Sequence, residues 1–197
     1  LHSFPTLSNN NIHHNDANGF CIKTGTLDID ATWDLTDIVY FIRDTVTVAV
    51  DKTLTINPDV IIKFADAGDL IINGTLKALG TVTDPIYFTS FRDDTVGGDT
   101  NGNGATVGAR SDWDRIEFTA SSNDASVIDH AVIRYAGTGY SSYYGGVRLI
   151  DSSPTIQNTE IAENSYCAIE ANLHSFPTLS NNNIHHNDAN GFCIKTG

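Results

Sequence analysis

The chain has 197 residues and a formal net charge of −13, with 24 acidic residues against 11 Lys and Arg and only three Cys. Such a negative charge argues against nucleic-acid binding, because the phosphate backbone would repel it. No apolar run is long enough to span a bilayer, so we expect no membrane insertion. The length suffices for one domain with a substantial core.

The sequence begins and ends with the same 25 residues, LHSFPTLSNNNIHHNDANGFCIKTG, at an offset of 172 positions. A duplication introduced at one end would explain this, but a window from a tandem array explains it better, because internal repeats at a fixed period are typical of solenoids. We therefore predict that residues 1–25 end a preceding unit and that residues 26–197 form one complete unit.

A shorter period of 23 residues appears when PTIQNTEIAENSYCAIEAN (154–172) is placed over PTLSNNNIHHNDANGFCIKTG (177–197). Pro, Asn and Ile then coincide at several positions, and short β-branched segments alternate with turn formers. This period is too short for helical repeats. It indicates an all-β fold, a right-handed parallel β-helix with three strands per coil and about six coils per 172-residue unit.

Three strand families follow in chain order. The first is expected at 20–22, 46–48, 70–72, 116–118, 147–149, 169–171 and 192–194. The second is expected at 27–29, 54–56 and 76–78 and around 128, 156 and 179. The third is expected at 38–42, 62–64, 86–88, 133–135, 161–163 and 184–186.

Stacking of these strands predicts which side chains lie over one another from coil to coil. Phe64 over Phe88 should form an aromatic stack, and Ile128, Ile156 and Leu179 an aliphatic column. Two Asn ladders are expected at turns, where side-chain amides satisfy backbone groups. The ladders are Asn158 over Asn181 and Asn164 over Asn187.

The segments TLTINPDVIIKF (53–64), INGTLKALGTVTDPIYFTS (72–90), WDRIEF (113–118) and the PTIQNTEIAEN coil resemble the right-handed parallel β-helix repeat family, the pectate-lyase-like solenoids. Such modules are frequent in large secreted and cell-surface bacterial proteins, so the resemblance implies an extracellular or cell-surface location. It does not specify function, because some relatives are polysaccharide lyases or hydrolases and many have no assigned activity.

One insertion, residues 91–112, interrupts the regular spacing of the coils. Its Asp99, Asn101 and Asn103 match the first half of a D-x-[DN]-x-[DN]-G calcium loop, in which alternate oxygens wrap a hard cation. Arg110 stands where the closing Glu of an EF-hand would be. An acidic loop held by Asx turns is the alternative. We expect calcium here, with the ligands Asp93, Asp94, Asp99, Asn101, Asn103 and Asp112.

Catalytic residues are not expected. Glu117 and Glu170 fall two coils apart on the outward side of the first family, about 9.6 Å at ~4.8 Å per coil, near the spacing of an inverting glycosidase. Arg148 lies between them, so an ion ladder is favoured over a catalytic pair. The outward column of the third family, expected to contain Lys63, Tyr87 and Arg134, offers no carboxylate pair.

Other residues have competing interpretations. His185 and His186, like His13 and His14, should point to opposite sides of a strand, with His186 pairing Glu163. His130 should serve the same turn as Asn158. Tyr140, Tyr143 and Tyr144 either cover the solenoid edge, which we favour, or stack on sugars.

The cysteines are expected to stay unbridged within the chain. Cys167 and Cys193 are displaced by about three residues along the strand, near 10 Å, too far for an easy disulfide. Cys193 is either a free thiol, which is the favoured interpretation, or the site of a disulfide between neighbouring chains.

These features predict a structural module that stacks end to end with adjacent identical units into a stiff extracellular filament, stalk or adhesin shaft. Other copies lying side by side and cell-surface polysaccharide are further expected partners. The alternative is a carbohydrate-active or carbohydrate-binding β-helix.

Overall fold

A computed structural model describes residues 1, 5, 7, 9–137 and 144–195. These residues form twenty strands and no helix. The strands are β1 (Phe20–Ile22), β2 (Gly25–Leu27), β3 (Ala31–Trp33), β4 (Tyr40–Ile42), β5 (Thr45–Val48), β6 (Thr53–Ile56), β7 (Ile61–Phe64), β8 (Asp69–Ile72), β9 (Thr75–Leu79), β10 (Ile86–Ser90), β11 (Ile116–Phe118), β12 (Val127–Asp129), β13 (Ala131–Arg134), β14 (Val147–Ile150), β15 (Thr155–Gln157), β16 (Glu160–Ala162), β17 (Ile169–Asn172), β18 (Thr178–Ser180), β19 (Asn183–His185) and β20 (Phe192–Lys195).

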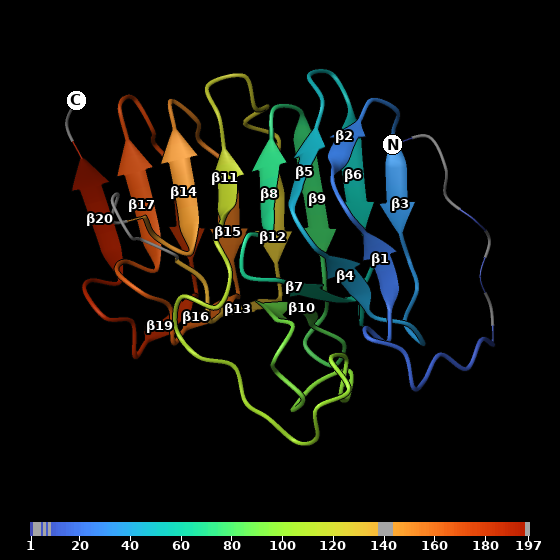
Figure 1. Cartoon of the computed structure of the whole chain (residues 1–197). Helices are drawn as coiled ribbons and strands as arrows, with labels where there is room; N and C mark the ends of the chain where they lie inside the picture. The colour runs from blue at the N-terminus through green and yellow to red at the C-terminus, as the bar shows by residue number, and fades with distance from the viewer. Residues whose placement is uncertain (2–4, 6, 8, 138–143, 196–197) are drawn as a thin grey trace.

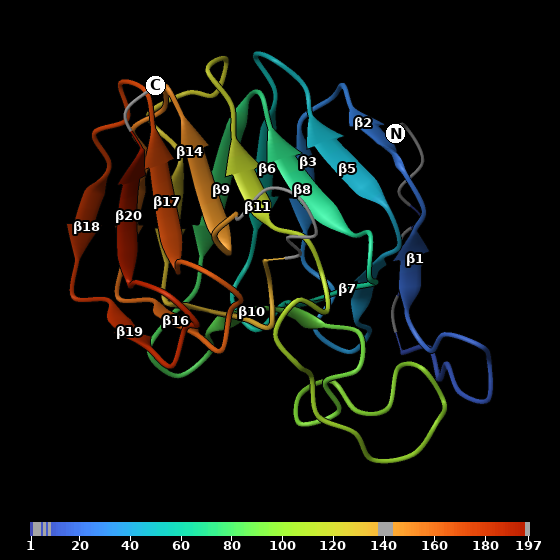
Figure 2. The ribbon, with the colours of Figure 1, turned by 60° about the vertical axis from the view of Figure 1, so that its left-hand side comes forward.

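Every third strand belongs to the same parallel sheet. Sheet A has the order β1-β4-β7-β10-β13-β16-β19, sheet B the order β2-β5-β8-β11-β14-β17-β20, and sheet C the order β3-β6-β9-β12-β15-β18. The chain thus winds through three sheets per coil, and the coils advance along one axis from blue to red (Figures 1 and 2). The predicted fold class, a right-handed parallel β-helix, is confirmed.

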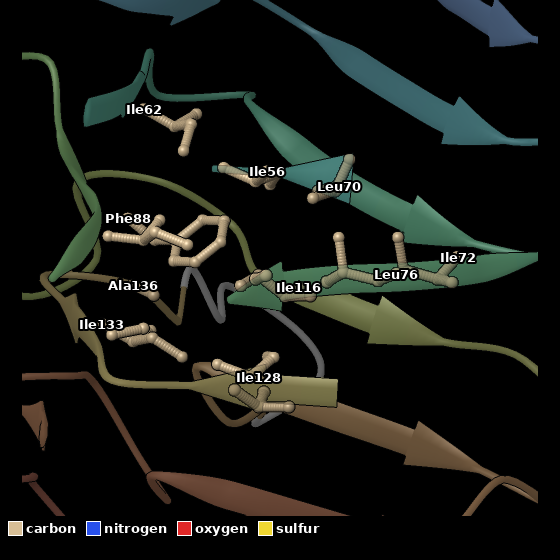
Figure 3. Close-up of a cluster of buried hydrophobic side chains, with 14 of the residues drawn as sticks. Ile56, Ile62, Leu70, Ile72, Leu76, Phe88, Ile116, Ile128, Ile133 and Ala136 are labelled. Carbon is tan, nitrogen blue, oxygen red and sulfur yellow. The ribbon is translucent and has the colours of Figure 1, made fainter. Parts of the chain in front are cut away.

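The core is a set of inward columns in which apolar side chains stack from coil to coil. In sheet B, Leu70, Ile116 and Val147 occupy successive positions of one column, and all three are fully buried. Side chains from the three sheets meet in the interior of the solenoid (Figure 3). Since one coil alone cannot bury such side chains, each depends on its neighbours for its core.

The predicted aliphatic column is confirmed in sheet C. Ile128 pairs with Ile156, which pairs with Leu179. Toward the N-terminal end of the sheet, the column continues through Ala78 and Ile56, so it runs almost the length of the sheet.

The predicted stack of Phe64 on Phe88 is wrong. Strand β10 is shifted by two residues, so that Phe88 pairs with Ile62 and the small Ser90 lies beside Phe64. The ring of Trp113 stacks on Phe64 instead, with centroids 4.1 Å apart and planes 8° from parallel. Trp113 comes from the segment that follows the insertion, which explains why coil periodicity could not place it.

The first coil also differs from the prediction. The segment Phe20–Ile22 lies in sheet A beside β4, not in sheet B, and Gly25–Leu27 takes the first place in sheet B. Sheet C begins at Ala31–Trp33 and not at 27–29, because Trp33 supplies the fully buried side chain whereas Ile29 is 38% exposed. The first strand of sheet C is therefore the segment that buries Trp33, and not the segment that the regular spacing of the strands indicates.

The turns after sheet C strands show the predicted stack of His130, Asn158 and Asn181. All three have left-handed backbone angles, φ of 48°, 50° and 55°, which Asn tolerates better than most residues. Asn181 donates to Asn158 Oδ1 at 3.4 Å, and Asn158 donates to Asp129 at 2.8 Å.

The second Asn ladder has more hydrogen bonds to the backbone, and Asn164, its first member, is buried. Asn164 is fully buried, accepts a hydrogen bond from the Ala136 amide at 2.9 Å and donates to Asn187 Oδ1 at 3.0 Å. Asn187 in turn donates to the Ile161 carbonyl at 3.0 Å. Each amide thus satisfies backbone groups of the preceding coil, as predicted.

Replacing Asn164 by Ala should lower the free energy of unfolding by about 1–3 kcal/mol, because buried backbone groups lose their partners. Asn183→Ala, at an exposed position of β19, is the matched control and should change it by less than about 0.5 kcal/mol. Urea unfolding measures both values. Equal effects of the two substitutions would contradict the ladder's role.

Candidate functional site

The insertion is the largest departure from the solenoid. It joins β10 to β11 and, with no strand of its own, folds back below sheet A (Figure 1, green to yellow at the bottom). Lys63 Nζ donates to the Gly98 carbonyl at 2.7 Å, and the Asn18 amide donates to the Thr100 carbonyl at 2.7 Å. Contacts with β7 and with the segment before β1 thus hold the loop in place.

Lys63 lies on the outward side of β7 yet is fully buried beneath this loop. Burial disfavours its charged form and lowers its pKa to about 8, opposed by the nearby carboxylates of Asp94, Asp93 and Asp99. A lysine at an outward strand position suggests an exposed residue, so this burial could not be predicted from the sequence. The ammonium supplies a cation among the acidic residues predicted to hold calcium.

The buried carboxylate of Asp93 is paired with an arginine side chain. It accepts a hydrogen bond from Thr89 Oγ1 at 2.6 Å and pairs with Arg134 at 2.6 Å. Tyr87 was predicted to lie beside Lys63 on the outward side of the sheet. The register shift of β10 places Thr89 there instead. Asp94 is held separately, by the amide of Thr106 at 2.7 Å.

Asp112 closes the other end of the loop. Its carboxylate accepts from Ser90 Oγ at 2.6 Å and pairs with Arg92 at 3.1 Å. Arg92 also pairs with Asp66 at 2.6 Å, so one guanidinium joins the loop to the turn after β7. These contacts tie the loop's two ends to one another.

The Asp99 turn has the hydrogen bonds expected of the Asx-turn alternative. Asp99 accepts from the amides of Gly102 at 2.7 Å and Gly104 at 2.9 Å, and the Asn103 amide donates to Asn101 at 3.4 Å. Both glycines have left-handed φ, 68° and 88°. The hydrogen bond from Gly104 is the main reason that the pKa of Asp99 lies below its usual value.

The six predicted calcium ligands are therefore divided among four hydrogen-bonded groups, around Asp93, Asp94, Asp99 and Asp112. Across the described residues, no three His, Cys, Asp or Glu side chains gather closely enough to hold a metal ion. Calcium binding stays a prediction, and a bound ion would have to compete with the partners described above.

The predicted ladder of Glu117, Arg148 and Glu170 is present on the outward face of sheet B. Arg148 lies 3.0 Å from Glu117 and 3.7 Å from Glu170, whose carboxylate is fully buried. Arg115 also pairs with Glu117 at 2.7 Å, and Lys195 with Glu170 at 3.1 Å. Both carboxylates are thus engaged by cations.

The Tyr144 ring lies over this ladder, 4.1 Å from the Arg148 guanidinium and 4.6 Å from that of Arg115. This position agrees with the prediction that the tyrosines cover the solenoid edge. Tyr140 and Tyr143 lie outside the described residues.

The histidine prediction is wrong in two respects. His185, not His186, approaches a carboxylate, that of Glu160 at 3.6 Å, while Glu163 pairs with Arg110 at 2.7 Å. The two histidines also face one another, with their Nδ1 atoms 2.7 Å apart. His186 has a φ of 52°, which ends the strand and its alternation.

The expectation that Cys167 stays unbridged is also wrong, because Cys167 and Cys193 form a disulfide with a Cα–Cα distance of 6.2 Å. The predicted distance assumed an extended chain between Cys167 and the strand. Tyr166 has a φ of 71° instead, so the chain turns and brings Cys167 close to the next coil. Cys21, the counterpart of Cys193 in the first copy, is a free and exposed cysteine.

No family model, no curated protein and no solved structure matches this chain. The parallel three-sheet solenoid is thus established by its own geometry, and membership of a particular β-helix family is not. In the described part of the chain there is no helix that could cross a bilayer.

Lys63 gives a testable pH dependence. Its pKa is lower in the folded than in the unfolded chain, so unfolding takes up a proton between about pH 8 and pH 10.5 and stability rises with pH in that window. Lys63→Met should remove this rise, about 2–3 kcal/mol from the size of the shift.

Unfolding by urea at pH 7.5, 9 and 10.5 measures the effect. Lys77→Met, at an exposed position of β9, is the control and should follow the unmodified chain. Parallel stability curves for Lys63→Met and the unmodified chain would contradict the buried charge.

Proposed function

We propose that this chain is a structural module that joins end to end with identical units into a stiff extracellular shaft, such as a filament, stalk or adhesin. The observation that carries the proposal is that the repeated 25-residue stretch forms the final coil of the solenoid, with one strand in each sheet. A following unit would continue from this coil.

The open end of the solenoid supports the same proposal. Strands β18, β19 and β20 are the last strands of their sheets and each pairs on one side only among the described strands. Ile194 is 71% exposed, whereas Ala171, its partner one coil earlier, is 2% exposed. A further coil would pair these edges and bury these side chains.

The disulfide supports an extracellular location. Bonds such as Cys167–Cys193 form and persist mainly in oxidising compartments. Its position also suits a shaft, because it ties the final coil to the chain one coil before.

The alternative function, carbohydrate binding or cleavage, has one observation in its favour. An open cleft of about 430 Å³ lies beside the stacked rings of Phe41 and Phe91 and is bordered by the carboxylates of Asp16, Asp44 and Asp66. Aromatic rings with nearby carboxylates can recognise sugars. Phe41 is only 6% exposed, however, and offers little ring surface for stacking, so we favour the structural role.

Calcium would stiffen the insertion and offset part of the net negative charge. If calcium binds with the dissociation constant typical of extracellular modules, about 0.1–1 mM, then about 5 mM Ca²⁺ should raise the melting temperature, and excess EDTA should reverse the change. Asp99→Asn should abolish the shift, while Asp124→Asn, far from the insertion, should retain it. A melting temperature unaffected by both additions would remove calcium from the account.

A chain lengthened by one further 172-residue unit tests the shaft directly. Six more coils at ~4.8 Å each should add about 29 Å to the maximum dimension with no change in cross-section. Small-angle X-ray scattering measures both quantities. Scattering typical of two bodies joined by a hinge would contradict end-to-end stacking.

A further inference from the structure

The repeated stretch carries two adjacent histidines, His13–His14 in its first copy (the first pair) and His185–His186 in its second (the second pair). In both pairs the rings face one another edge to face, with centroids 4.7 and 4.9 Å apart and planes 79° and 88° from parallel. The two Nδ1 atoms of the second pair are 2.7 Å apart, and those of the first pair are likewise in contact. Each pair thus points two Nδ1 atoms at one shared place.

The local sequence His-His-Asn builds this arrangement. The second histidine of each pair has a left-handed φ, 56° in the first pair and 52° in the second, so the alternation of a strand is broken and both rings lie on one side. The following Asn donates to the carbonyl of the first histidine, at 3.1 Å from Asn15 and 3.0 Å from Asn187. The first pair lies outside any strand whereas His185 ends β19, so the arrangement forms in two different settings.

The short distance between the Nδ1 atoms limits where protons can be. Two nitrogens 2.7 Å apart cannot both carry a hydrogen, because each would point it at the other, so at least one presents a lone pair. On the far side of the His185 ring, the Glu160 carboxylate lies 3.6 Å from Nε2. A carboxylate there favours the proton on Nε2 and leaves the lone pair on Nδ1, as is usual behind metal-bound histidines.

We propose that each pair binds one borderline divalent transition-metal ion, such as Zn²⁺, through its two Nδ1 atoms. Imidazole nitrogen suits Zn²⁺, Ni²⁺ and Cu²⁺, whereas Ca²⁺ and Mg²⁺ prefer oxygen. Tetrahedral zinc with bonds of about 2.0–2.1 Å holds two nitrogens about 3.3 Å apart, so the rings must separate by about half an ångström. His186 is exposed and His185 has 36% of its side chain exposed, so no core packing resists this movement.

Binding of the ion conserves protons in a neutral pair. The hydrogen that lies between the rings moves from Nδ1 of His186 to its Nε2 through water, and both Nδ1 lone pairs then face the ion. No third His, Cys, Asp or Glu side chain lies close enough among the described residues, so water takes the remaining positions. The site should therefore be weaker than zinc sites with four protein ligands.

Metal binding at the pairs does not depend on the stacking of units proposed above. The net charge of −13 favours the uptake of cations in either case. Where units do stack, one pair recurs in each 172-residue unit, which gives a row of ions about 29 Å apart at ~4.8 Å per coil.

Zinc titration by isothermal titration calorimetry, with 5 mM Ca²⁺ present to occupy carboxylates, tests the site. The unmodified chain should bind two Zn²⁺ ions, and a variant with His13→Ala and His14→Ala should bind one. Adding His186→Ala to that variant should weaken the remaining site at least about tenfold, because one arm of the chelate is lost. Equal zinc affinity with and without His186→Ala would overturn the proposal.

The matched control is His174→Ala, which removes a histidine that belongs to neither pair and has 84% of its side chain exposed. In the variant that keeps only the second pair, this substitution should leave zinc affinity unchanged. A loss equal to that caused by His186→Ala would show scattered binding to surface histidines and contradict a site at the pair.

Nuclear magnetic resonance identifies the atoms that bind. Long-range ¹H–¹⁵N spectra should show Zn²⁺ shifting the Nδ1 resonances of His185 and His186, while their Nε2 atoms carry the protons and the His174 ring is unchanged. Zinc-induced shifts that bypass both Nδ1 atoms would contradict the proposed coordination.

Discussion

Parallel backbone pairing between successive coils is the interaction on which the rest of this structure depends. Among the described strands, each interior strand pairs with the strands one coil before and one coil after it, in all three sheets. Because this pairing is directional and repeats along one axis, the inward side chains form columns. The same geometry leaves unpaired groups at the last coil, since an edge strand always presents free donors and acceptors.

The insertion shows how an acidic chain can bury charge against a solenoid. The carboxylates of Asp93 and Asp112 each have an arginine partner, and Lys63 lies beneath the loop with a pKa lowered to about 8. Buried charges of this kind are tolerated only when they are paired and hydrogen-bonded. The loop is therefore held by interactions with the outward face of sheet A, and its acidity is balanced locally by the chain itself.

The coil architecture could be predicted from sequence because it depends on local period and side-chain type. The Asn164–Asn187 ladder follows from the 23-residue alignment. The Ile128–Ile156 pair and the Glu117–Arg148–Glu170 ladder follow from carrying the three strand families through the rest of the chain. Features that depend on irregular segments could not be predicted. Trp113 stacks on Phe64 in place of Phe88, and a left-handed Tyr166 brings Cys167 close to Cys193. Lys63 is buried beneath the loop that carries Gly98, 35 residues later in the chain.

Phe20–Ile22 lies in sheet A, whereas its counterpart in the second copy of the repeated stretch, Phe192–Ile194, lies in sheet B. A cryo-electron-microscopy structure of the chain lengthened by one unit tests most directly whether the solenoid continues from one unit into the next. We expect all three sheets to continue through the junction without a break, with the residues equivalent to Phe20–Lys23 of the second unit in sheet B. A junction in which those residues lie in sheet A, with the preceding residues outside any sheet, would contradict it.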